Sequence, residues 1–214
     1  MTDLASVKAE TTIEELKTMA AAEKWGFAGI YGLPAHNPML RELMGDNPKS
    51  FLGGAVGFPS GGVSTETKVF ETVKNIEAGC GEIDMVVNIA WLKAGMLREF
   101  EADIRAVVEA ADGLVVKTIL EVHHLSADEI GTASSIAAGC GVSFIKTATG
   151  WAESGANREN IGIIKDAIAG TSCEIKAAGG IRTLESVREM LDLGVRRFGC
   201  GTETALKIID EIEK

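Results

Sequence analysis

Two lysines thirty residues apart stand in short apolar segments that are typical of buried strands. Lys146 follows Ser143-Phe144-Ile145 and precedes a run of small residues that ends at Gly150, and Lys176 leads into Ala177-Ala178-Gly179-Gly180. Lysine is depleted in strands, and its charge is costly to bury. A desolvated lysine beside a second cation loses basicity, and its neutral amine can attack a carbonyl carbon. This pattern predicts an enzyme that forms a Schiff base.

Two further ionisable residues interrupt neighbouring apolar segments. Asp84 lies within 82–88 and Lys117 lies within 115–121, so four consecutive predicted strands each carry an ionisable side chain. Buried salt bridges that only stabilise the fold are the alternative interpretation. Three lysines against one aspartate and one glutamate leave a surplus of positive charge, which favours a functional cluster over a purely structural one.

The composition fits a globular protein with one large core. The chain has 214 residues, of which 46% are hydrophobic and 24% are charged, and its formal net charge is −10. We therefore expect a single domain over residues 1–214, with neither nucleic acid nor an anionic membrane as a partner. The first residues do not resemble a signal peptide, and no apolar run has membrane-spanning length, so we expect a cytoplasmic protein.

The four cysteines are dispersed, with no Cys-x-x-Cys pair. This distribution favours reduced, buried thiols over a disulfide framework or a metal site, and we expect neither a metal nor another cofactor.

Eight short apolar segments alternate with longer segments of helical spacing, an order that predicts a parallel sheet. Eight such units close most naturally as a single (βα)8 TIM barrel of the α/β class, with lean loops for this chain length. An open doubly wound sheet is the alternative, weakened because the usual glycine-rich dinucleotide fingerprint is absent. The predicted strands are Asp3–Val7, Phe27–Tyr31, Phe51–Phe58, Ile83–Asn88, Val115–Glu121, Ser143–Thr149, Cys173–Ala178 and Arg196–Cys200.

Several predicted helices have recognisable first and last residues. Thr12 with Glu15 and Ser126 with Glu129 have the spacing of capping boxes. The other predicted N-caps are Ser64, Asn157, Thr183 and Asn37, the last followed by a proline, and the predicted helix stops are Gly45, Gly79, Gly139 and Gly194.

Glycines end the last three predicted strands. Gly150 follows strand six, Gly179 and Gly180 follow strand seven, and Gly199 and Gly201 close strand eight. Tight turns need glycine in any protein, but backbone amides at such turns can also hold an anion. Because barrels often bind phosphate after strands seven and eight, we expect a phosphate site there.

Five motifs together resemble the deoxyribose-phosphate aldolase family, from about Gly53 to the C-terminus. Residues 1–50 match the family only loosely, through Asp3 and Pro34. The motifs are Gly57-Phe58-Pro59, Glu82-x-Asp84-Met85-Val86-x-Asn88, Lys117-x-Ile119-Leu120-Glu121, Phe144-Ile145-Lys146-Thr147-x-Thr149-Gly150 and Lys176-Ala177-Ala178-Gly179-Gly180-Ile181-Arg182.

The resemblance implies a metal-independent class I aldolase on a (βα)8 barrel. Such an enzyme cleaves 2-deoxyribose 5-phosphate to glyceraldehyde 3-phosphate and acetaldehyde. It implies that Lys146 is the Schiff-base lysine, Lys176 the second lysine that lowers its pKa, Asp84 the acid–base aspartate and Asp3 a supporting aspartate. It also places Gly150, Gly179, Gly180 and Gly199 at phosphate-contacting positions and suggests a homo-oligomer.

Lys117 completes the candidate catalytic set, and Thr147, Gly201 and Thr202 complete the candidate substrate-binding set. The chain departs from the family pattern at three places near the substrate's far end. Trp151 stands where many members have a phosphate-facing lysine, Tyr31 where many have a cysteine, and Cys200-Gly201 where serines are usual. Two other hypotheses therefore stay open: a lysine-dependent aldolase for a different or unphosphorylated sugar, and a phosphosugar-binding barrel without catalysis.

Overall fold

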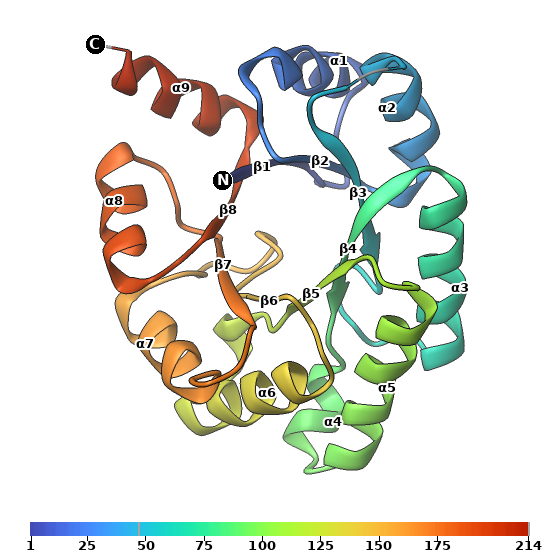
Figure 1. Cartoon of the computed structure of the whole chain (residues 1–214), viewed down its shortest axis with the longest axis vertical. Helices are drawn as coiled ribbons and strands as arrows, with labels where there is room; N and C mark the ends of the chain where they lie inside the picture. Colours follow the sequence, from blue (N-terminus) through green and yellow to red (C-terminus); the bar gives the residue numbers. More distant parts are fainter. Residues whose placement is uncertain (47, 214) are drawn as a thin grey trace.

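Eight parallel strands form a closed barrel in the order of the sequence, β1 to β8, with β8 pairing back onto β1 (Figure 1). The computed structural model describes residues 1–46 and 48–213. The predicted (βα)8 barrel is confirmed, and the open doubly wound sheet is wrong. The strands are β1 (Thr2–Ser6), β2 (Gly29–Gly32), β3 (Phe51–Val56), β4 (Cys80–Val86), β5 (Val115–Ile119), β6 (Phe144–Lys146), β7 (Glu174–Ala178) and β8 (Arg197–Gly201).

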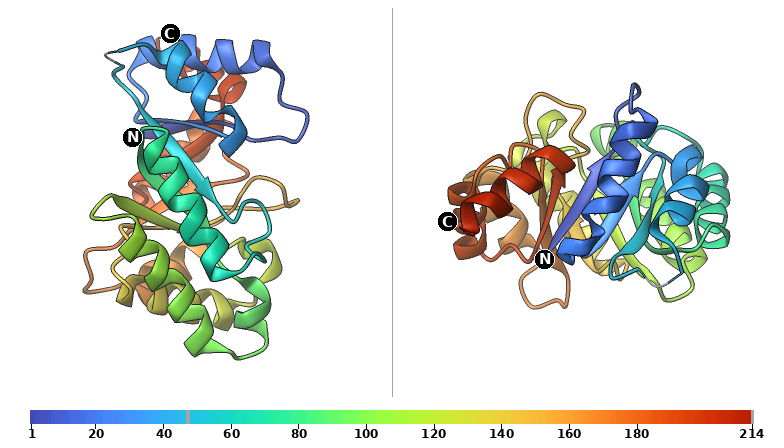
Figure 2. Two further views of the ribbon diagram at one scale, coloured as in Figure 1. Left: turned by 90° about the vertical axis from the view of Figure 1, so that its right-hand side faces the viewer. Right: turned by 90° about the horizontal axis from the view of Figure 1, so that it is seen from above.

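Helices cover the outside of this barrel, and α1 and α9 flank the seam at which β8 meets β1 (Figures 1 and 2). The α-helices are α1 (Ile13–Ala21), α2 (Asn37–Met44), α3 (Thr65–Glu77), α4 (Ile89–Lys93), α5 (Leu97–Ala110), α6 (Ala127–Gly139), α7 (Arg158–Ala167), α8 (Leu184–Leu193) and α9 (Thr202–Ile212). Short 3-10 turns are η1 (Ala22–Trp25), η2 (Pro34–His36) and η3 (Val122–His124). None of the helices in the described part of the chain is long and apolar enough to cross a membrane.

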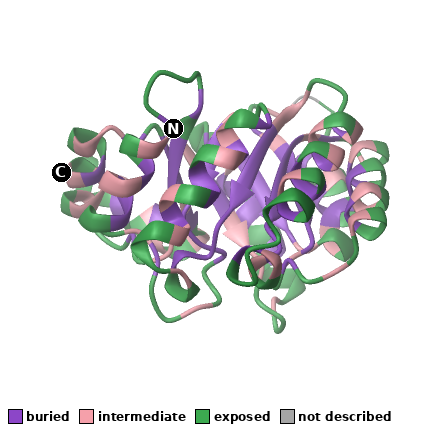
Figure 3. Ribbon diagram, turned by 90° about the horizontal axis from the view of Figure 1, so that it is seen from below, coloured by how far each residue is buried: buried purple, intermediate pink, exposed green. Residues whose placement is uncertain are grey.

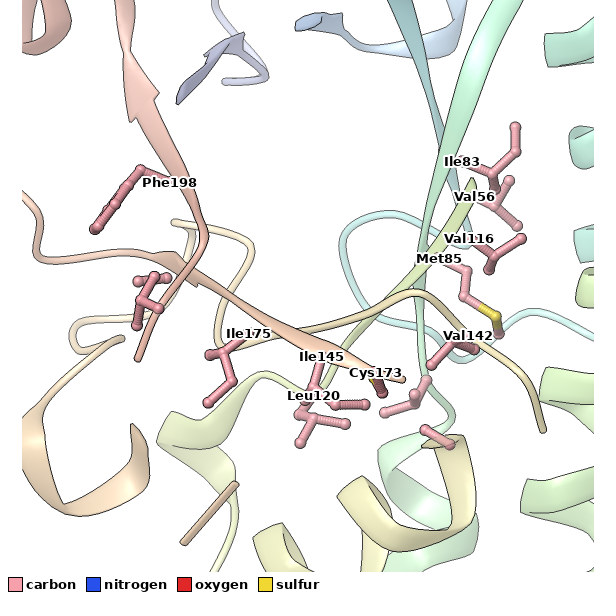
Figure 4. Close-up of a cluster of buried hydrophobic side chains, with 14 of the residues drawn as sticks. Val56, Ile83, Met85, Val116, Leu120, Val142, Ile145, Cys173, Ile175 and Phe198 are labelled. Atoms are coloured by element: carbon pink, nitrogen blue, oxygen red, sulfur yellow. The ribbon is translucent and has the colours of Figure 1, made fainter. Parts of the chain in front are cut away.

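The hydrophobic core lies between the strands and the helices, not inside the barrel. Successive side chains of a strand point to opposite faces, so apolar and ionisable residues alternate. Figure 4 shows Ile83, Val116, Ile145, Ile175 and Phe198 among the side chains that pack on the helix side of the strands. Each is adjacent in sequence to an ionisable residue that points inward. The burial pattern agrees, with buried strands surrounded by helices whose outer faces are exposed (Figure 3).

Most predicted helix caps are confirmed. The side chains of Thr12, Ser126, Asn157 and Thr183 form complete capping boxes, and Ser64 caps α3. The Asn37 cap is wrong: Asn37 is the first residue of α2, and its amide donates a 2.8 Å hydrogen bond to Asn75 Oδ1 instead. Helices end at or near Gly45, Gly79, Gly139 and Gly194 as predicted, and Gly141 (φ 87°) takes the left-handed turn after α6.

Several predicted strands are longer than the observed ones, and β5 and β6 differ most at their C-terminal ends. β5 ends at Ile119, since Glu121 adopts a left-handed conformation at φ 54°. β6 ends at Lys146, after which Thr147 Oγ1 bonds the Ala178 backbone, accepting from its N–H at 2.9 Å and donating to its carbonyl at 2.7 Å.

Candidate active site

Lys146 is the last residue of β6, and its side chain reaches the floor of a cavity at the C-terminal end of the barrel. The cavity has a volume of about 630 Å³. Lys146 is 8% exposed, and its Nζ lies 2.9 Å from Asp84 Oδ2 on β4. The Cα register pairs Lys146 with Lys176 on β7, so the two lysines that the sequence singled out lie side by side.

Asp84 is the centre of a buried network that holds three lysines. Besides Lys146, it accepts hydrogen bonds from Lys176 Nζ at 2.7 Å and from Lys117 Nζ at 2.9 Å. Lys176 also pairs with Asp3 Oδ2 at 2.6 Å, so the structure brings together all five candidate catalytic residues.

Two members of this network were not among the sequence candidates. Arg197 on β8 bonds Asp3 at 2.8 Å and Glu82 at 3.2 Å, and Glu82 also pairs with Lys117. A signal was available, because Glu82 stands two residues before Asp84 and therefore faces the same side of β4. The interior charge cluster thus consists of Asp3, Glu82, Asp84, Lys117, Lys146, Lys176 and Arg197.

This cluster holds four basic side chains and three carboxylates, so one positive charge is left over if all are ionised. The glutamate in the interior is Glu82, whereas Glu121 bonds Thr149. The predicted surplus of positive charge is present.

The surplus is concentrated on Lys146. Burial and the neighbouring Lys176 and Lys117 ammonium groups lower the pKa of Lys146 to about 8, and Asp84 opposes this effect. At pH 7 roughly a tenth of a group with this pKa is a neutral amine, compared with less than a thousandth at lysine's ordinary value.

The neighbours of Lys146 remain ionised. Burial lowers the pKa of Lys176, but Asp3 and Asp84 outweigh it, so the net direction is upward. Burial raises the pKa of Asp84, but the lysines Lys117, Lys146 and Lys176 outweigh it and hold that pKa well below its usual range. The arrangement therefore supplies a fixed carboxylate and a fixed cation on either side of a lysine that can lose its proton.

Among the described residues, Lys146 is the one member of the interior charge cluster that lines the cavity. The rest of the wall comes from the ends of β1, β6, β7 and β8, the turns that follow them, and residues of α1 and α9. It includes Ser6, Lys8, Thr149, Gly150, Trp151, Gly179, Gly180, Gly199, Gly201 and Thr202. A molecule in the cavity can therefore meet one lysine amine at its inner end and backbone-rich turns at its outer end.

Comparison with known proteins gives the family. The family model described as "DeoC/LacD family aldolase" matches residues 7–208. A deoxyribose-phosphate aldolase of Sinorhizobium medicae is 43% identical over 210 residues, covering 97% of this chain and 84% of that protein. One of Klebsiella pneumoniae is 39% identical over 217 residues, covering 100% and 87%.

The chain belongs to the DeoC/LacD family of aldolases. It is an enzyme of the carbon–carbon lyase class. Solved structures share its fold: the aldolase QR15 superposes with a TM-score of 0.87 at 29% identity, covering 96% of this chain and 94% of that one. A deoxyribose phosphate aldolase of Aeropyrum pernix superposes with a TM-score of 0.85 at 21% identity, covering 100% and 89%.

The glycines predicted for phosphate binding lie in the aldolase cavity wall. Gly150, Gly179 and Gly180 all have left-handed backbones, at φ 89°, 75° and 87°. Gly199 and Gly201 lead into α9, which begins at Thr202 and has no side-chain cap at its N-terminus. An uncapped helix N-terminus offers amide groups and the positive end of the helix dipole to an anion.

Thr147 is the exception among the candidate binding residues. It is fully buried, and its hydroxyl is occupied by the Ala178 backbone described above. It does not line the cavity, and its hydrogen bonds instead join the end of β6 to β7.

Trp151 shapes the cavity rim. Its indole N–H donates a 2.8 Å hydrogen bond to the carbonyl of Val7, and its ring meets Phe58 edge-on at a centroid distance of 5.9 Å. Its backbone N–H donates to Thr149 Oγ1 at 3.0 Å, and that hydroxyl in turn bonds Glu121. Trp151 thereby ties the loop after β6 to the loop after β1.

The charges at the rim have mixed signs. Lys8 is the cation of the outer wall, and Glu14, Glu15 and Glu203 also line the cavity. Each of these carboxylates has a local partner: Lys17, the Thr12 cap and Lys207, respectively. The outer end is therefore less cationic than a site built around several basic side chains. Within the described residues, no group of three or more histidine, cysteine or acidic side chains is arranged to hold a metal ion.

Proposed function

We propose that residues 1–214 act as one domain that cleaves 2-deoxy-D-ribose 5-phosphate reversibly to D-glyceraldehyde 3-phosphate and acetaldehyde. The relatives at 43% and 39% identity carry the name of this activity. The observation that carries the proposal is that Lys146 borders the cavity with a pKa lowered to about 8, while its charged neighbours are sealed beneath it.

The first step is attack of the neutral Lys146 amine on the substrate aldehyde. The addition gives a carbinolamine, and loss of water gives a protonated imine. When the bond between C2 and C3 breaks, its electron pair moves toward the iminium nitrogen and forms an enamine. The C3 hydroxyl loses its proton in the same step, and C3 leaves as the aldehyde of glyceraldehyde 3-phosphate.

The enamine must then gain a proton at C2 before water releases acetaldehyde and free Lys146. Asp84 Oδ2 lies 2.9 Å from Lys146 Nζ and 2.7 Å from Lys176 Nζ, within reach of protons on both amines. An ionised Asp84 can accept a proton during carbinolamine formation and return one later, directly or through water. Lys176 keeps its charge and so favours the neutral form of Lys146.

The phosphate group is assigned to the outer end of the cavity. The turns at Gly150, Gly179–Gly180 and Gly199–Gly201, with the N-terminus of α9, provide the backbone amides. Trp151 supplies no charge at this end. Loss of one charge-assisted phosphate contact costs about 1.5–3 kcal/mol, or about tenfold to a hundredfold in affinity.

The test combines a cleavage assay on 2-deoxyribose 5-phosphate with borohydride trapping of the acetaldehyde adduct. We expect turnover, and we expect the reduced adduct on Lys146 when the protein is digested and examined by mass spectrometry. Lys146→Arg should abolish both signals. An adduct on Lys176 would overturn the assignment of the nucleophile, and sugar-phosphate binding without cleavage would support the non-catalytic barrel.

A second candidate function is an aldolase of the same lysine chemistry for an unphosphorylated or different sugar. The observation that favours it is the rim itself, where Trp151 and the three carboxylates line the cavity together. Turnover of 2-deoxyribose with and without its 5-phosphate decides between the two. A large preference for the phosphorylated sugar eliminates this candidate.

Assembly into a homo-oligomer remains a prediction, and sedimentation at several protein concentrations would test it.

A further inference from the structure

Tyr31 occupies the interior of the barrel beneath the cavity. It is 3% exposed and lies on β2, a strand that contributes no charged side chain. Its ring meets Phe51 edge-on at a centroid distance of 6.4 Å. Phe51 and Phe144 also face this interior, with the Arg197 guanidinium 5.2 Å and 6.0 Å from their ring centroids. Tyr31 differs from both because its hydroxyl forms hydrogen bonds within the charge cluster.

Glycines on β2 itself and on the neighbouring β3 leave room for this ring. A Cβ at Gly53 on β3 would lie 2.1 Å from Tyr31 Cε1, and a Cβ at Gly29 would lie 3.0 Å from Cε2. The first of these distances is impossible for a real side chain. Tyr31 and Gly53 therefore form a matched pair, in which one residue supplies the bulk that the other omits.

The Tyr31 ring lies close to three lysines, and Lys117, whose Nζ is 5.3 Å from the ring centroid, also bonds the hydroxyl. Lys176 Nζ lies 4.5 Å from the ring centroid, a typical cation–π distance, and Lys146 Nζ lies at 5.9 Å. The hydroxyl accepts a hydrogen bond from Lys117 Nζ at 2.7 Å and donates to Glu82 Oε2 at 3.4 Å. Burial raises the pKa of Tyr31 well above its ordinary value, so the hydroxyl stays neutral and keeps its donor proton.

We propose that Tyr31 is a positioning residue, whose ring holds the Lys176 ammonium and excludes water beneath Lys146. The inference rests on the proposed role of Lys146 as the nucleophile. The charged groups that surround the ring are Asp3 from β1, Glu82 and Asp84 from β4, Lys117 from β5, Lys146 from β6, Lys176 from β7 and Arg197 from β8.

Removal of the ring has a defined consequence for Lys146. Lys176 would lose the aromatic face and could move into the vacated space, which weakens its repulsion of a Lys146 cation. Water that entered the space would also solvate that cation. Both changes favour protonated Lys146, so they act in the same direction.

The experiment measures the protonation of Lys146 without requiring turnover. The folded protein is labelled with a trace of acetic anhydride across a pH series, and the labelling of Lys146 is quantified by mass spectrometry. In Tyr31→Leu, we expect the midpoint to rise by about half a unit to one unit. In Tyr31→Phe, which keeps the ring, we expect the midpoint of the unaltered protein.

Gly53→Ala supplies an independent variant, because its Cβ would displace the ring. We expect the same upward shift, and the double variant Gly53→Ala/Tyr31→Leu should shift no further than Tyr31→Leu alone. Gly54→Ala on the same strand is the matched control. Its Cβ would lie 2.6 Å from Asn75 Cβ, so it disturbs the packing against α3 and leaves Tyr31 in place.

An unchanged Lys146 midpoint in folded Tyr31→Leu would overturn the inference and leave Tyr31 as packing. So would equal shifts in Gly53→Ala and Gly54→Ala. A third outcome separates the two proposals. If the Lys146 midpoint rises in Tyr31→Leu as expected, but the unaltered protein never forms the borohydride adduct, the proposed function is wrong and the positioning role of Tyr31 stands.

Discussion

Two buried lysines, Lys68 and Lys146, each pair with an aspartate but lie in different surroundings. Lys68 lies between α3 and α5, fully buried, with its Nζ 2.5 Å from Asp103 Oδ2. Lys146 lies at the end of β6, with its Nζ 2.9 Å from Asp84. Burial lowers the pKa of both. Burial and a carboxylate partner therefore do not by themselves distinguish a structural lysine from a reactive one.

The difference lies in what each carboxylate must satisfy. Asp103 serves one lysine and accepts its other hydrogen bond from the hydroxyl of Thr65 at 2.9 Å. Asp84 is shared among three lysines. Lys146 is also the one that borders the cavity. A shared counter-charge and a position at the cavity, rather than burial, distinguish Lys146, the proposed nucleophile, from Lys68.

Replacement of each lysine by methionine gives the largest contrast. Lys146→Met should lower kcat/KM by about 10⁴-fold or more, because the covalent route is lost. Lys68→Met should keep kcat/KM per folded molecule near its original value. Steady-state kinetics on both purified variants checks this, and equal losses of activity would remove the distinction between the two lysines.

For stability, we expect the larger effect from the Lys68 variant rather than from the Lys146 variant. Lys68→Met leaves Asp103 buried without its cation, so we expect a loss of about 3–5 kcal/mol in the free energy of unfolding. The double variant Lys68→Met/Asp103→Leu should recover most of that loss, because neither charge remains. Urea denaturation measures both. A Lys68→Met protein as stable as the original would show that this pair has no structural role.

The shared carboxylate gives a third contrast. Asp84→Asn should lower kcat by about 10²- to 10³-fold through loss of proton transfer. Asp84 raises the pKa of Lys146, so its removal should also move the acid limb of the kcat/KM profile below pH 8. Asp103→Asn is the control and should leave that limb in place. An upward shift in Asp84→Asn would contradict the electrostatic assignment.

The smallest expected effect is the pH dependence of the unaltered enzyme. The proposed attack requires neutral Lys146, whose pKa is lowered to about 8. The amine is protonated below that value, so kcat/KM should fall about tenfold per unit of decreasing pH and level off above it. Initial rates from pH 6 to 10 test this. A limb near 10.5, the ordinary lysine value, would mean that Lys146 behaves like an unperturbed surface lysine.

The sequence predicted the barrel because its signals were local. Apolar runs of strand length alternate with capped helices, and the side-chain oxygens of Thr12, Ser126, Asn157 and Thr183 accept the hydrogen bonds expected of N-caps. The Asn37 prediction failed because the same side chain had a tertiary partner in Asn75. A local pattern cannot reveal a competing contact thirty-eight residues away.

The sequence also singled out Asp84, Lys117, Lys146 and Lys176, since an ionisable residue within an apolar strand is visible in one segment, whereas Asp3 followed only from the family resemblance. It did not single out Arg197, Glu82 or Lys68. Lys68 lies on α3, where a lysine normally faces solvent. Only the packing of α3 against α5 buries it and gives it Asp103.

The sequence by itself determined the alternation of strands and helices and the strands on which the ionisable residues lie. Tertiary structure decided which charges share a partner, which lysine reaches the cavity, and that Tyr31 fits beneath it. Those outcomes depend on closure of the barrel, which brings Asp3 of β1 against Lys176 of β7 and Arg197 of β8. Electrostatic coupling falls off with distance between atoms rather than along the chain, so the lowered pKa of Lys146 is a property of the closed barrel.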